Sequence, residues 1–408
     1  MAFGGKKRRL NPSNPQVQTI DELEVCPEIQ YQPGLQTAPG GLVRGRENQV
    51  LASKPKSGPI HGHPKSDITS GMPEPNVSRR GVLTGAAMTA AALADEVLAQ
   101  TSSASATGLP TRVLGRTGQR VSIACLGGWH IGAVKDHNEA IRIMHTAIDE
   151  GLTFFDNAWD YHDGHSEEVM GKALKTDGRR KKVFLMTKNC ERDYAGSMKN
   201  LDDSLRRMQT DYLDLWQFHE MVYDNDPDWV FEKGGLKAAL EARKAGKVRF
   251  IGFTGHKDPR IHLKMLGKPH DWDTAQMPIN VLDRFYRSFQ QEVVPVCLKK
   301  NVGVIGMKGL AGGHPQGRLI EKFGLSATDC FRYCLSLPIV SQVMGITTMA
   351  QLKEDIALAR TFKPMTAGEK ETLLSKVREE ASDGRHELFK SAKTYDGPHH
   401  RKQHGFDI

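Results

Sequence analysis

The feature that most constrains this chain is a regular alternation of short β-branched or aromatic runs with amphipathic stretches. Eight runs are predicted as strands, and they cover residues 121–126, 153–156, 183–187, 212–216, 248–253, 274–277, 302–306 and 340–345. The stretches 138–150, 166–174, 198–208 and 236–245 have helical periodicity, with Gly151 and Gly246 at the expected helix ends. Eight strand-helix units at a spacing of about 30 residues favour an α/β fold, a closed (β/α)₈ TIM barrel, over a doubly wound sheet, which usually has fewer strands.

Two further elements are predicted at the ends of this barrel. The runs 112–115 and 119–121, joined by Arg116, Thr117 and Gly118, predict an N-terminal β-hairpin that plugs the bottom of the barrel. Residues 366–380 predict an extra C-terminal helix. We therefore assign residues 107–363 to the barrel and residues 364–408 to a C-terminal helix and polar tail. The tail histidines are expected to be solvated rather than metal-binding; they are His386, His399, His400 and His404.

The first hundred residues have a different composition. Residues 1–77 contain much Pro, Gly, Ser and Asn and few large apolar side chains, so they are predicted to be disordered, or to be a wrongly assigned extension. In residues 78–106, Arg79-Arg80 precede a weakly apolar stretch and then small residues, an order that resembles a twin-arginine export signal. This signal starts unusually late, and translation from Met72 would give it a normal position. The alternative is a short Ala-rich surface helix.

The signal implies the twin-arginine export machinery as a partner and a periplasmic or exported location, or a cytoplasmic one if the signal is not used. Other classes of protein are excluded by composition. The longest apolar run, residues 81–94, is too short for a polytopic membrane protein. The net charge of +8 is spread along the chain without interleaved aromatic residues, so nucleic-acid binding is not expected. The six cysteines form no CxxC pair, and we assign them no chemistry.

Polar side chains end three successive predicted strands. Asp156, Lys188 and His219 occupy these positions, and Tyr161 follows in the loop after Asp156. A buried charge without a partner costs several kcal/mol, so Lys188 is expected to pair with Asp156. Each residue alone has an ordinary structural explanation, as a helix cap, a surface lysine, a core histidine or a loop aromatic. Together they predict chemistry: the ammonium of Lys188 should lower the pKa of Tyr161 and make it a proton donor to a carbonyl oxygen.

These residues carry a family resemblance. The segment Asp156–Tyr161, which reads DNAWDY, and the following Ser166-Glu167 resemble a motif of the aldo-keto reductases, and Thr187-Lys188 and Phe218-His219 resemble the lysine and histidine motifs of that family. The resemblance implies an NAD(P)H-dependent oxidoreductase that transfers hydride between nicotinamide and an aldehyde, ketone or sugar-type carbonyl. It implies Tyr161 as general acid, Asp156 and Lys188 as the groups that tune it, and His219 as the group that orients the carbonyl.

The resemblance also implies where NADPH, or NADH, would bind. No GxGxxG motif supports a Rossmann site, and the cofactor would lie across the strand ends. The implied contacts are Thr254, Gln276, Met307, Lys308, Gly309, Leu310, Gly345, Thr347, Gln351, Glu354 and Asp355. Met307 stands where many members have an aromatic ring. Gln351 stands where many have an arginine for the 2′-phosphate, which weakens the preference for NADPH over NADH.

Four residues are expected to line the mouth of the site around a small-molecule carbonyl substrate: Trp129, His130, Trp159 and Tyr223. Aromatic walls suit an apolar or sugar-ring substrate, and they equally suit packing at a barrel rim. Two other functions are considered. A regulatory barrel would bind nucleotide with little or no turnover. A metal-dependent sugar isomerase would need several carboxylates and histidines at strand ends, where only Asp156 and His219 stand out, so no metal is expected.

Overall fold

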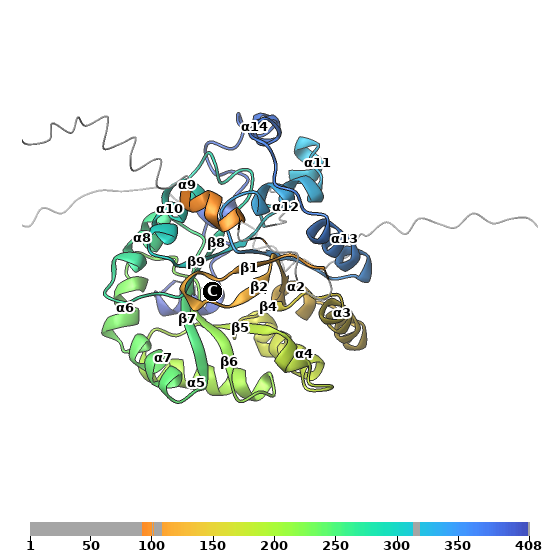
Figure 1. Ribbon diagram of the computed structural model, residues 1–408. Helices are drawn as coiled ribbons and strands as arrows, with labels where there is room; N and C mark the ends of the chain where they lie inside the picture. The colour runs from red at the N-terminus through yellow and green to blue at the C-terminus, as the bar shows by residue number, and fades with distance from the viewer. Residues whose placement is uncertain (1–91, 100, 102–107, 313–318, 407–408) are drawn as a thin grey trace, which may run out of the picture. The chain divides into compact units, whose positions relative to one another are not determined.

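Eight parallel strands close into a barrel, as the sequence predicts, and helices surround it (Figure 1). This computed structural model describes residues 92–99, 101, 108–312 and 319–406. The barrel strands are β3 (Ala124–Gly127), β4 (Phe154–Asp156), β5 (Phe184–Asn189), β6 (Leu213–Phe218), β7 (Val248–Thr254), β8 (Thr274–Pro278), β9 (Gly303–Met307) and β10 (Ser341–Met344). The last strand pairs with the first, with Met344 opposite Leu126, and this pairing closes the barrel.

The helices follow the amphipathic stretches of the sequence. Those after β3 are α2 (Gly128–Gly132), α3 (His137–Asp149), α4 (His165–Leu174), α5 (Tyr194–Arg207), α6 (Asp226–Glu232), α7 (Gly235–Lys244), α8 (Pro259–Gly267), α9 (Phe289–Glu292), α10 (Val294–Lys299), α11 (Leu319–Phe323), α12 (Ala327–Leu335), α13 (Met349–Arg360), α14 (Ala367–Ser375), α15 (Leu388–Ser391) and α16 (Pro398–Gln403). Gly151 and Gly246 adopt the positive φ that ends a helix, as predicted. None of the helices in the described ranges is long and apolar enough to span a bilayer.

Some element boundaries differ from the prediction. The predicted strand 121–126 is broken at Ile123, because β2 (Arg120–Ser122) turns away to pair with β1 (Thr111–Val113). Strands β5 and β6 extend two residues beyond their predicted ends, so Lys188 lies within β5. The predicted helix 366–380 is shorter, and α14 begins at a capping box between Thr366 and Glu369.

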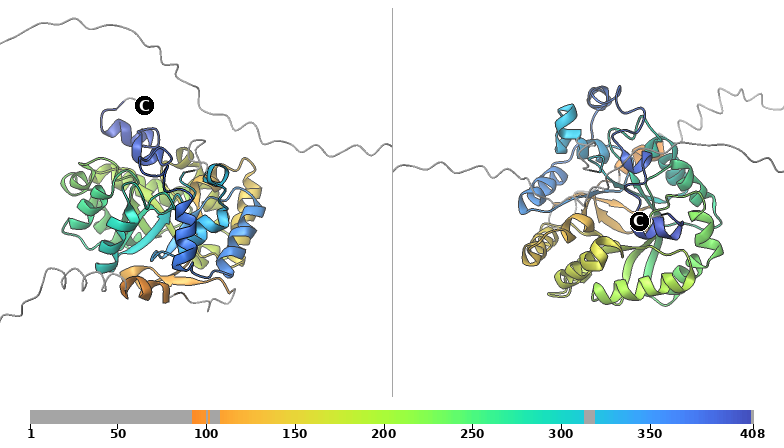
Figure 2. Two further views of the ribbon diagram at one scale, coloured as in Figure 1. Left: turned by 90° about the horizontal axis from the view of Figure 1, so that it is seen from above. Right: turned by 180° about the vertical axis from the view of Figure 1, so that it is seen from behind.

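The β1–β2 hairpin closes one end of the barrel, as predicted. Leu114 and Val121 are fully buried and belong to one apolar cluster with Phe154 and Phe184 of the barrel interior. Gly115 has φ +50°, and a Cβ atom there would lie 2.4 Å from the backbone nitrogen of Gly303, so the hairpin backbone touches β9 directly. Figure 2 (left) shows the hairpin, in orange, at the end of the barrel opposite the C-terminal tail, in dark blue.

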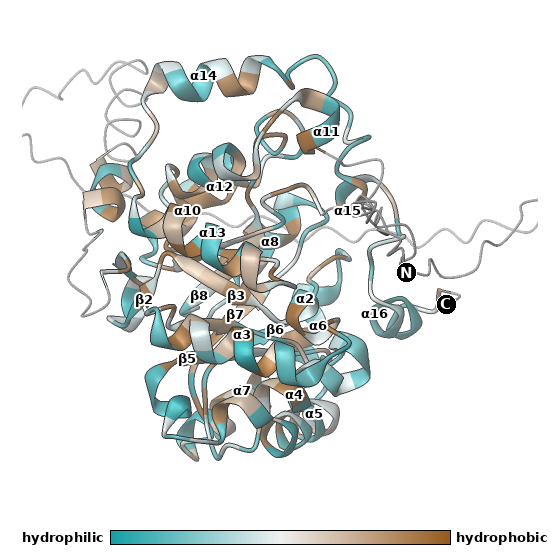
Figure 3. Ribbon diagram, turned by 90° about the vertical axis from the view of Figure 1, so that its right-hand side faces the viewer, coloured by the Kyte–Doolittle hydropathy of each residue, from teal (hydrophilic) through white to brown (hydrophobic). Residues whose placement is uncertain are grey.

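The C-terminal tail corrects one expectation. Its last helix, α16, is mostly hydrophilic in Figure 3, yet its His400 is fully buried and His386 is 6% exposed. These histidines are therefore not solvated. His386 pairs with Glu380 of the tail itself, at 3.1 Å. The partners of the other two pairs come from the barrel: Glu191 lies 2.9 Å from His399, and Asp226 lies 3.0 Å from His404. The spacing of residues within the tail gives no sign of these barrel partners.

The predicted N-terminal extension over residues 1–77 lies outside the described residues. So does most of the predicted 78–106 signal segment, including Arg79 and Arg80. Within that segment, residues 92–99 form a helix.

Candidate active site

The structure brings Asp156, Tyr161, Lys188 and His219 together at the carboxyl end of the barrel. Asp156 ends β4, Lys188 lies near the end of β5 and His219 directly follows β6. Tyr161 begins the short 3₁₀ helix η2 (Tyr161–Gly164). The rings of Tyr161 and His219 meet edge to face, with centroids 5.6 Å apart. Parallel strands that end on one face account for the convergence of these side chains.

Lys188 is the centre of this group. Its side chain is 1% exposed, and its Nζ lies 2.5 Å from Asp156 Oδ1, 2.6 Å from the Asn157 carbonyl oxygen and 3.3 Å from Tyr161 Oη. Three acceptors thus surround the buried ammonium, which offsets part of its desolvation cost. Burial raises the pKa of Asp156, and the attraction of Lys188 opposes that shift. The expected Asp156–Lys188 pair is present.

The expected lowering of the Tyr161 pKa is wrong for this structure. Burial, together with the negative charges of Asp156, Asp160 and Glu220, raises the pKa of Tyr161 well above its ordinary value. The ammonium of Lys188 is largely compensated by Asp156, which lies closer to it than Tyr161 does. In the protein without cofactor or substrate, the phenol therefore remains protonated across the neutral pH range.

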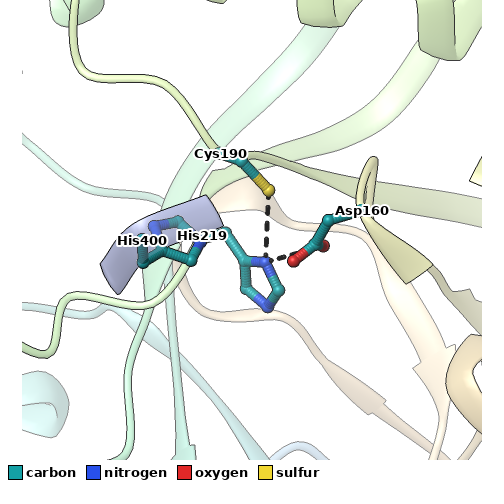
Figure 4. A group of neighbouring side chains, drawn as sticks. All are labelled: Asp160, Cys190, His219 and His400. Atoms are coloured by element: carbon teal, nitrogen blue, oxygen red, sulfur yellow. Dashed lines mark hydrogen bonds and ion pairs between the residues drawn. The ribbon is translucent and has the colours of Figure 1, made fainter. Parts of the chain in front are cut away.

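His219 is fixed through one side of its ring. Its Nδ1 lies 3.2 Å from Asp160 Oδ1 and 3.5 Å from Cys190 Sγ (Figure 4). The other ring nitrogen, Nε2, points away from both partners (Figure 4). Burial resists ionisation of Asp160, but His219, His400 and Cys190 together hold its pKa below the usual range. Reasoning from the sequence missed Asp160 and Cys190; the only available signal was their position after strand ends, as for Tyr161 and His219.

The loop that carries Tyr161 is held by the second half of its motif. Ser166 Oγ donates to the Gly128 carbonyl oxygen at 2.7 Å, and the buried Glu167 accepts from Thr187 Oγ1 at 2.6 Å. Arg207 pairs with Glu167 at 3.1 Å and also donates to the Trp159 carbonyl oxygen. The Ser-Glu part of the motif therefore positions the tyrosine loop against β5 and α5.

The predicted cofactor residues are distributed around the same rim. Thr254 and Gln276 face each other across β7 and β8, and both are buried. Gln276 Oε1 accepts from Gln217 Nε2 at 2.8 Å. Met307 ends β9, and Lys308 follows with φ +55°. Burial lowers the pKa of Lys308 to about 8.

The remaining predicted cofactor residues follow β9 and β10. Gly309 is buried and Leu310 partly buried, before the loop continues into residues 313–318 outside the described ranges. A Cβ atom on Gly345 would lie 2.6 Å from the ring of His130, so these two residues are in direct contact.

Helix α13 shows what Gln351 does in this structure. Its Oε1 accepts from the backbone nitrogens of Thr347 and Thr348, and it forms a capping box with Thr348. Glu354 is exposed, whereas Asp355 is buried, and burial raises the pKa of Asp355 to about 7. The two predicted acidic contacts therefore lie on different faces of the helix.

The predicted mouth residues separate into two groups. Trp129 is 52% exposed and packs edge to face on Tyr161, with ring centroids 5.4 Å apart. Trp159 and Tyr223 instead contact the C-terminal tail: Trp159 meets the His399 ring at 5.4 Å, and the Tyr223 hydroxyl donates to Asp396 at 3.0 Å. The tail covers this second group.

The donors at this end of the barrel fit a nicotinamide dinucleotide. Gln276 offers a side-chain amide on β8, Lys308 offers a cation, and the N-terminus of α13 carries the positive end of a helix dipole. Because Gly345 has no side chain, the backbone after β10 can approach the ring of His130. An amide, a cation and a helix N-terminus are the donor types that bind a carboxamide and phosphates.

Known proteins share this fold and sequence. An uncharacterized oxidoreductase, YrpG, of Bacillus subtilis (strain 168) is 31% identical over 239 residues, which cover 51% of this chain and 68% of that protein. An L-galactose dehydrogenase of Arabidopsis thaliana is 25% identical over 318 residues, 67% of this chain and 96% of that protein. The solved structure of an aldo-keto reductase from Bacillus halodurans in its holo form is 26% identical, with a TM-score of 0.56 over 66% of this chain and 96% of that one.

Fold and relatives together define a barrel-type oxidoreductase. A sequence model described as "Aldo/keto reductase family" matches residues 124–325, the range that contains all four tetrad residues. The chain belongs to the aldo/keto reductase family.

Proposed function

We propose that this protein is an NAD(P)H-dependent reductase of aldehydes, ketones or sugar-type carbonyls, with Tyr161 as the proton donor. The observation that carries this proposal is the 3.3 Å distance from Tyr161 Oη to the ammonium of Lys188, which is itself paired with Asp156. A pure nucleotide-binding barrel has no need of this pairing. The name of one relative, L-galactose dehydrogenase, supports oxidoreductase chemistry on a sugar-type substrate.

The bound nicotinamide would supply hydride to the carbonyl carbon. Tyr161 donates its proton to the carbonyl oxygen, and its raised pKa keeps that proton in place at neutral pH. Lys188 stabilises the phenolate that remains, because its ammonium lies 3.3 Å from Tyr161 Oη. His219 orients the carbonyl through Nε2, and Trp129 forms an apolar wall beside Tyr161.

The cofactor contacts are part of the same proposal. Thr254 and Gln276 would hold the carboxamide, and Met307, Lys308, Gly309 and Leu310 would approach the pyrophosphate. The segment from Gly345 to Asp355 would meet the adenosine. NADPH is the first candidate and NADH the second, since Gln351 carries no positive charge.

The test uses the purified full chain. NADPH and NADH are titrated by fluorescence, and consumption is then followed with a panel of carbonyl compounds. We expect Tyr161→Phe to lower kcat/KM by about 10²–10⁴-fold with nucleotide affinity unchanged. The control is Tyr194→Phe, which alters an exposed hydroxyl on α5 that bonds to Glu241. Turnover undiminished in Tyr161→Phe, or nucleotide binding without turnover by the wild type, would support the regulatory barrel instead.

We also propose that the protein is exported through the twin-arginine route. The support is the order of Arg79-Arg80, weakly apolar stretch and small residues in the sequence. Replacing both arginines by lysine should keep the protein in the cytoplasm, as measured by cell fractionation. An unchanged distribution would remove this proposal.

A further inference from the structure

A cluster of potential metal ligands lies beside the tetrad. It consists of Asp160, Cys190, His219 and His400, shown in Figure 4, and each residue offers one ligand atom within 4.8 Å of the other three. The first three follow the ends of β4, β5 and β6, and His400 comes from α16 in the tail. The cluster thus joins three successive barrel loops to the C-terminus.

The short contacts in this cluster have the dimensions of a metal site. Bonds of about 2.0–2.1 Å from zinc to nitrogen or oxygen, set at tetrahedral angles, place the ligand atoms about 3.3 Å apart, and a sulfur ligand at about 2.3 Å raises this separation to about 3.5 Å. The observed separations from His219 Nδ1 are 3.2 Å to Asp160 Oδ1 and 3.5 Å to Cys190 Sγ. These two separations match two edges of a tetrahedral site.

Hydrogen bonding at His219 Nδ1 can serve only one of its two neighbours. A ring nitrogen either donates one hydrogen or offers one lone pair, so His219 Nδ1 cannot bond fully to both Asp160 and Cys190. A cation among the three satisfies all of them at once.

His400 provides a separate observation. Its side chain is fully buried, and its Nε2 has no hydrogen-bond partner among the described residues. Glu220 Oε2 is 3.7 Å from this atom, and the other ring nitrogen, Nδ1, lies 3.4 Å from Arg192 Nη2. A buried polar atom without a partner costs about 1–3 kcal/mol, and ligation of a metal would remove that cost.

We propose that Asp160, Cys190, His219 and His400 bind one Zn²⁺ ion in a closed, four-coordinate structural site. Two imidazoles, a thiolate and a carboxylate are all ligand types that zinc binds. The thiolate and the carboxylate together carry two negative charges, which balance the charge of the ion in a buried place. The metal holds the tail on the barrel, because His400 is the ligand that the tail contributes.

Zinc on Nδ1 also fixes the second nitrogen of His219. With Nδ1 occupied, Nε2 carries the ring proton and can donate a hydrogen bond to a substrate oxygen. This consequence rests on the proposed reductase function. The metal site itself does not, since metal content is measured without cofactor or substrate.

The experiment uses the full chain without a histidine tag. After incubation with excess ZnCl₂ and dialysis, elemental analysis should find about one zinc per chain. With Co²⁺ in place of zinc, the wild type should show a thiolate-to-cobalt charge-transfer band from Cys190. Loss of a residue that only hydrogen-bonds to a metal ligand weakens metal binding by roughly 10–100-fold. Cys190→Ala and His400→Ala each remove a direct ligand, so each should weaken metal binding by at least this factor. The controls are Cys297→Ala, which alters a buried cysteine on α10, and His399→Ala, which alters the neighbouring histidine.

Circular dichroism checks that each variant is folded. The cobalt spectrum of the wild type tests the site even if a variant does not fold. A further readout is limited proteolysis, since EDTA should expose residues 384–406 to cleavage in the wild type. A wild type that retains no stoichiometric metal, or that binds cobalt without the charge-transfer band, overturns the proposal. So does metal content that survives in both ligand variants.

Discussion

Replacing Asp156 by asparagine tests the central ion pair of the site. The variant keeps the size of the side chain but leaves the Lys188 ammonium, 1% exposed, without its carboxylate. Breaking a buried pair by removing one partner costs about 3–5 kcal/mol. Because the Asn157 carbonyl and the Tyr161 hydroxyl remain near Lys188 Nζ, we expect the lower end, about 3 kcal/mol of unfolding free energy. Urea unfolding at pH 7, followed by circular dichroism, measures this difference.

A second substitution separates lost charge pairing from simple damage. Lys188→Met in the Asp156→Asn background removes the unpaired ammonium, so the double variant should recover most of the lost stability. The coupling energy between the two positions should exceed about 1 kcal/mol. An Asp156→Asn variant within about 0.5 kcal/mol of the wild type would refute the reasoning, as would a double variant less stable than the single one.

The same variant also changes the acidity of Tyr161. After burial, the charge of Asp156 is the largest influence that raises the pKa of Tyr161. Asp156→Asn should therefore lower the pKa of Tyr161, and an alkaline limb of kcat that depends on this phenol should move to lower pH. Ultraviolet titration of the tyrosines, compared with Tyr161→Phe, identifies the transition of this residue. A limb that moves to higher pH would contradict the assignment.

Three other positions give predictions of different kinds. Gln351→Arg should raise the ratio of the NADH to the NADPH dissociation constant by about 10-fold, since a hydrogen bond from a charged group to the 2′-phosphate contributes about 1.5–3 kcal/mol. The same change should slightly destabilise α13, because it removes the capping box. Asp355 has a folded pKa of about 7, above its unfolded value near 3.9, so the wild type loses stability as the pH rises toward 7. Asp355→Asn should be more stable than the wild type by about 1–3 kcal/mol at pH 8 and equal to it at pH 4. Urea unfolding at the two pH values measures this difference. Gly252→Ala should destabilise the barrel by about 1–3 kcal/mol, because its Cβ would lie 2.0 Å from Thr274 Oγ1, whereas Gly368→Ala in α14 meets nothing within 4 Å and should not destabilise it in the same assay.

The sequence predicted those parts of the fold that depend on residues close together in the chain. The barrel strands and the helices around Gly151 and Gly246 follow from apolar periodicity and helix-end residues. The break at Ile123 could not be predicted, because the run 121–126 has no turn residue and only the pairing of β2 with β1 separates its two halves. The placement of the tail could not be predicted either, because His399 and His404 meet carboxylates that are far away in sequence.

The candidate site was predicted in the same uneven way. Asp156, Lys188 and His219 could be found because each ends a strand in the sequence. The direction of the Tyr161 pKa could not, since it depends on burial and on several carboxylates whose distances only the fold defines. The cluster of potential ligands with Cys190 was missed for the same reason: its four residues come from four separate segments.

The β1–β2 hairpin at the amino end of the barrel determines when the domain can finish folding during its synthesis. Arg112, a fully buried residue of that hairpin, donates hydrogen bonds to the carbonyl oxygens of Leu335 and Ile339, which lie 223 and 227 residues later in the chain. The first part of the domain to leave the ribosome therefore waits for nearly the last strand before it reaches its final place. Contacts of such long range slow folding, so we expect this domain to become native only after its translation is almost complete.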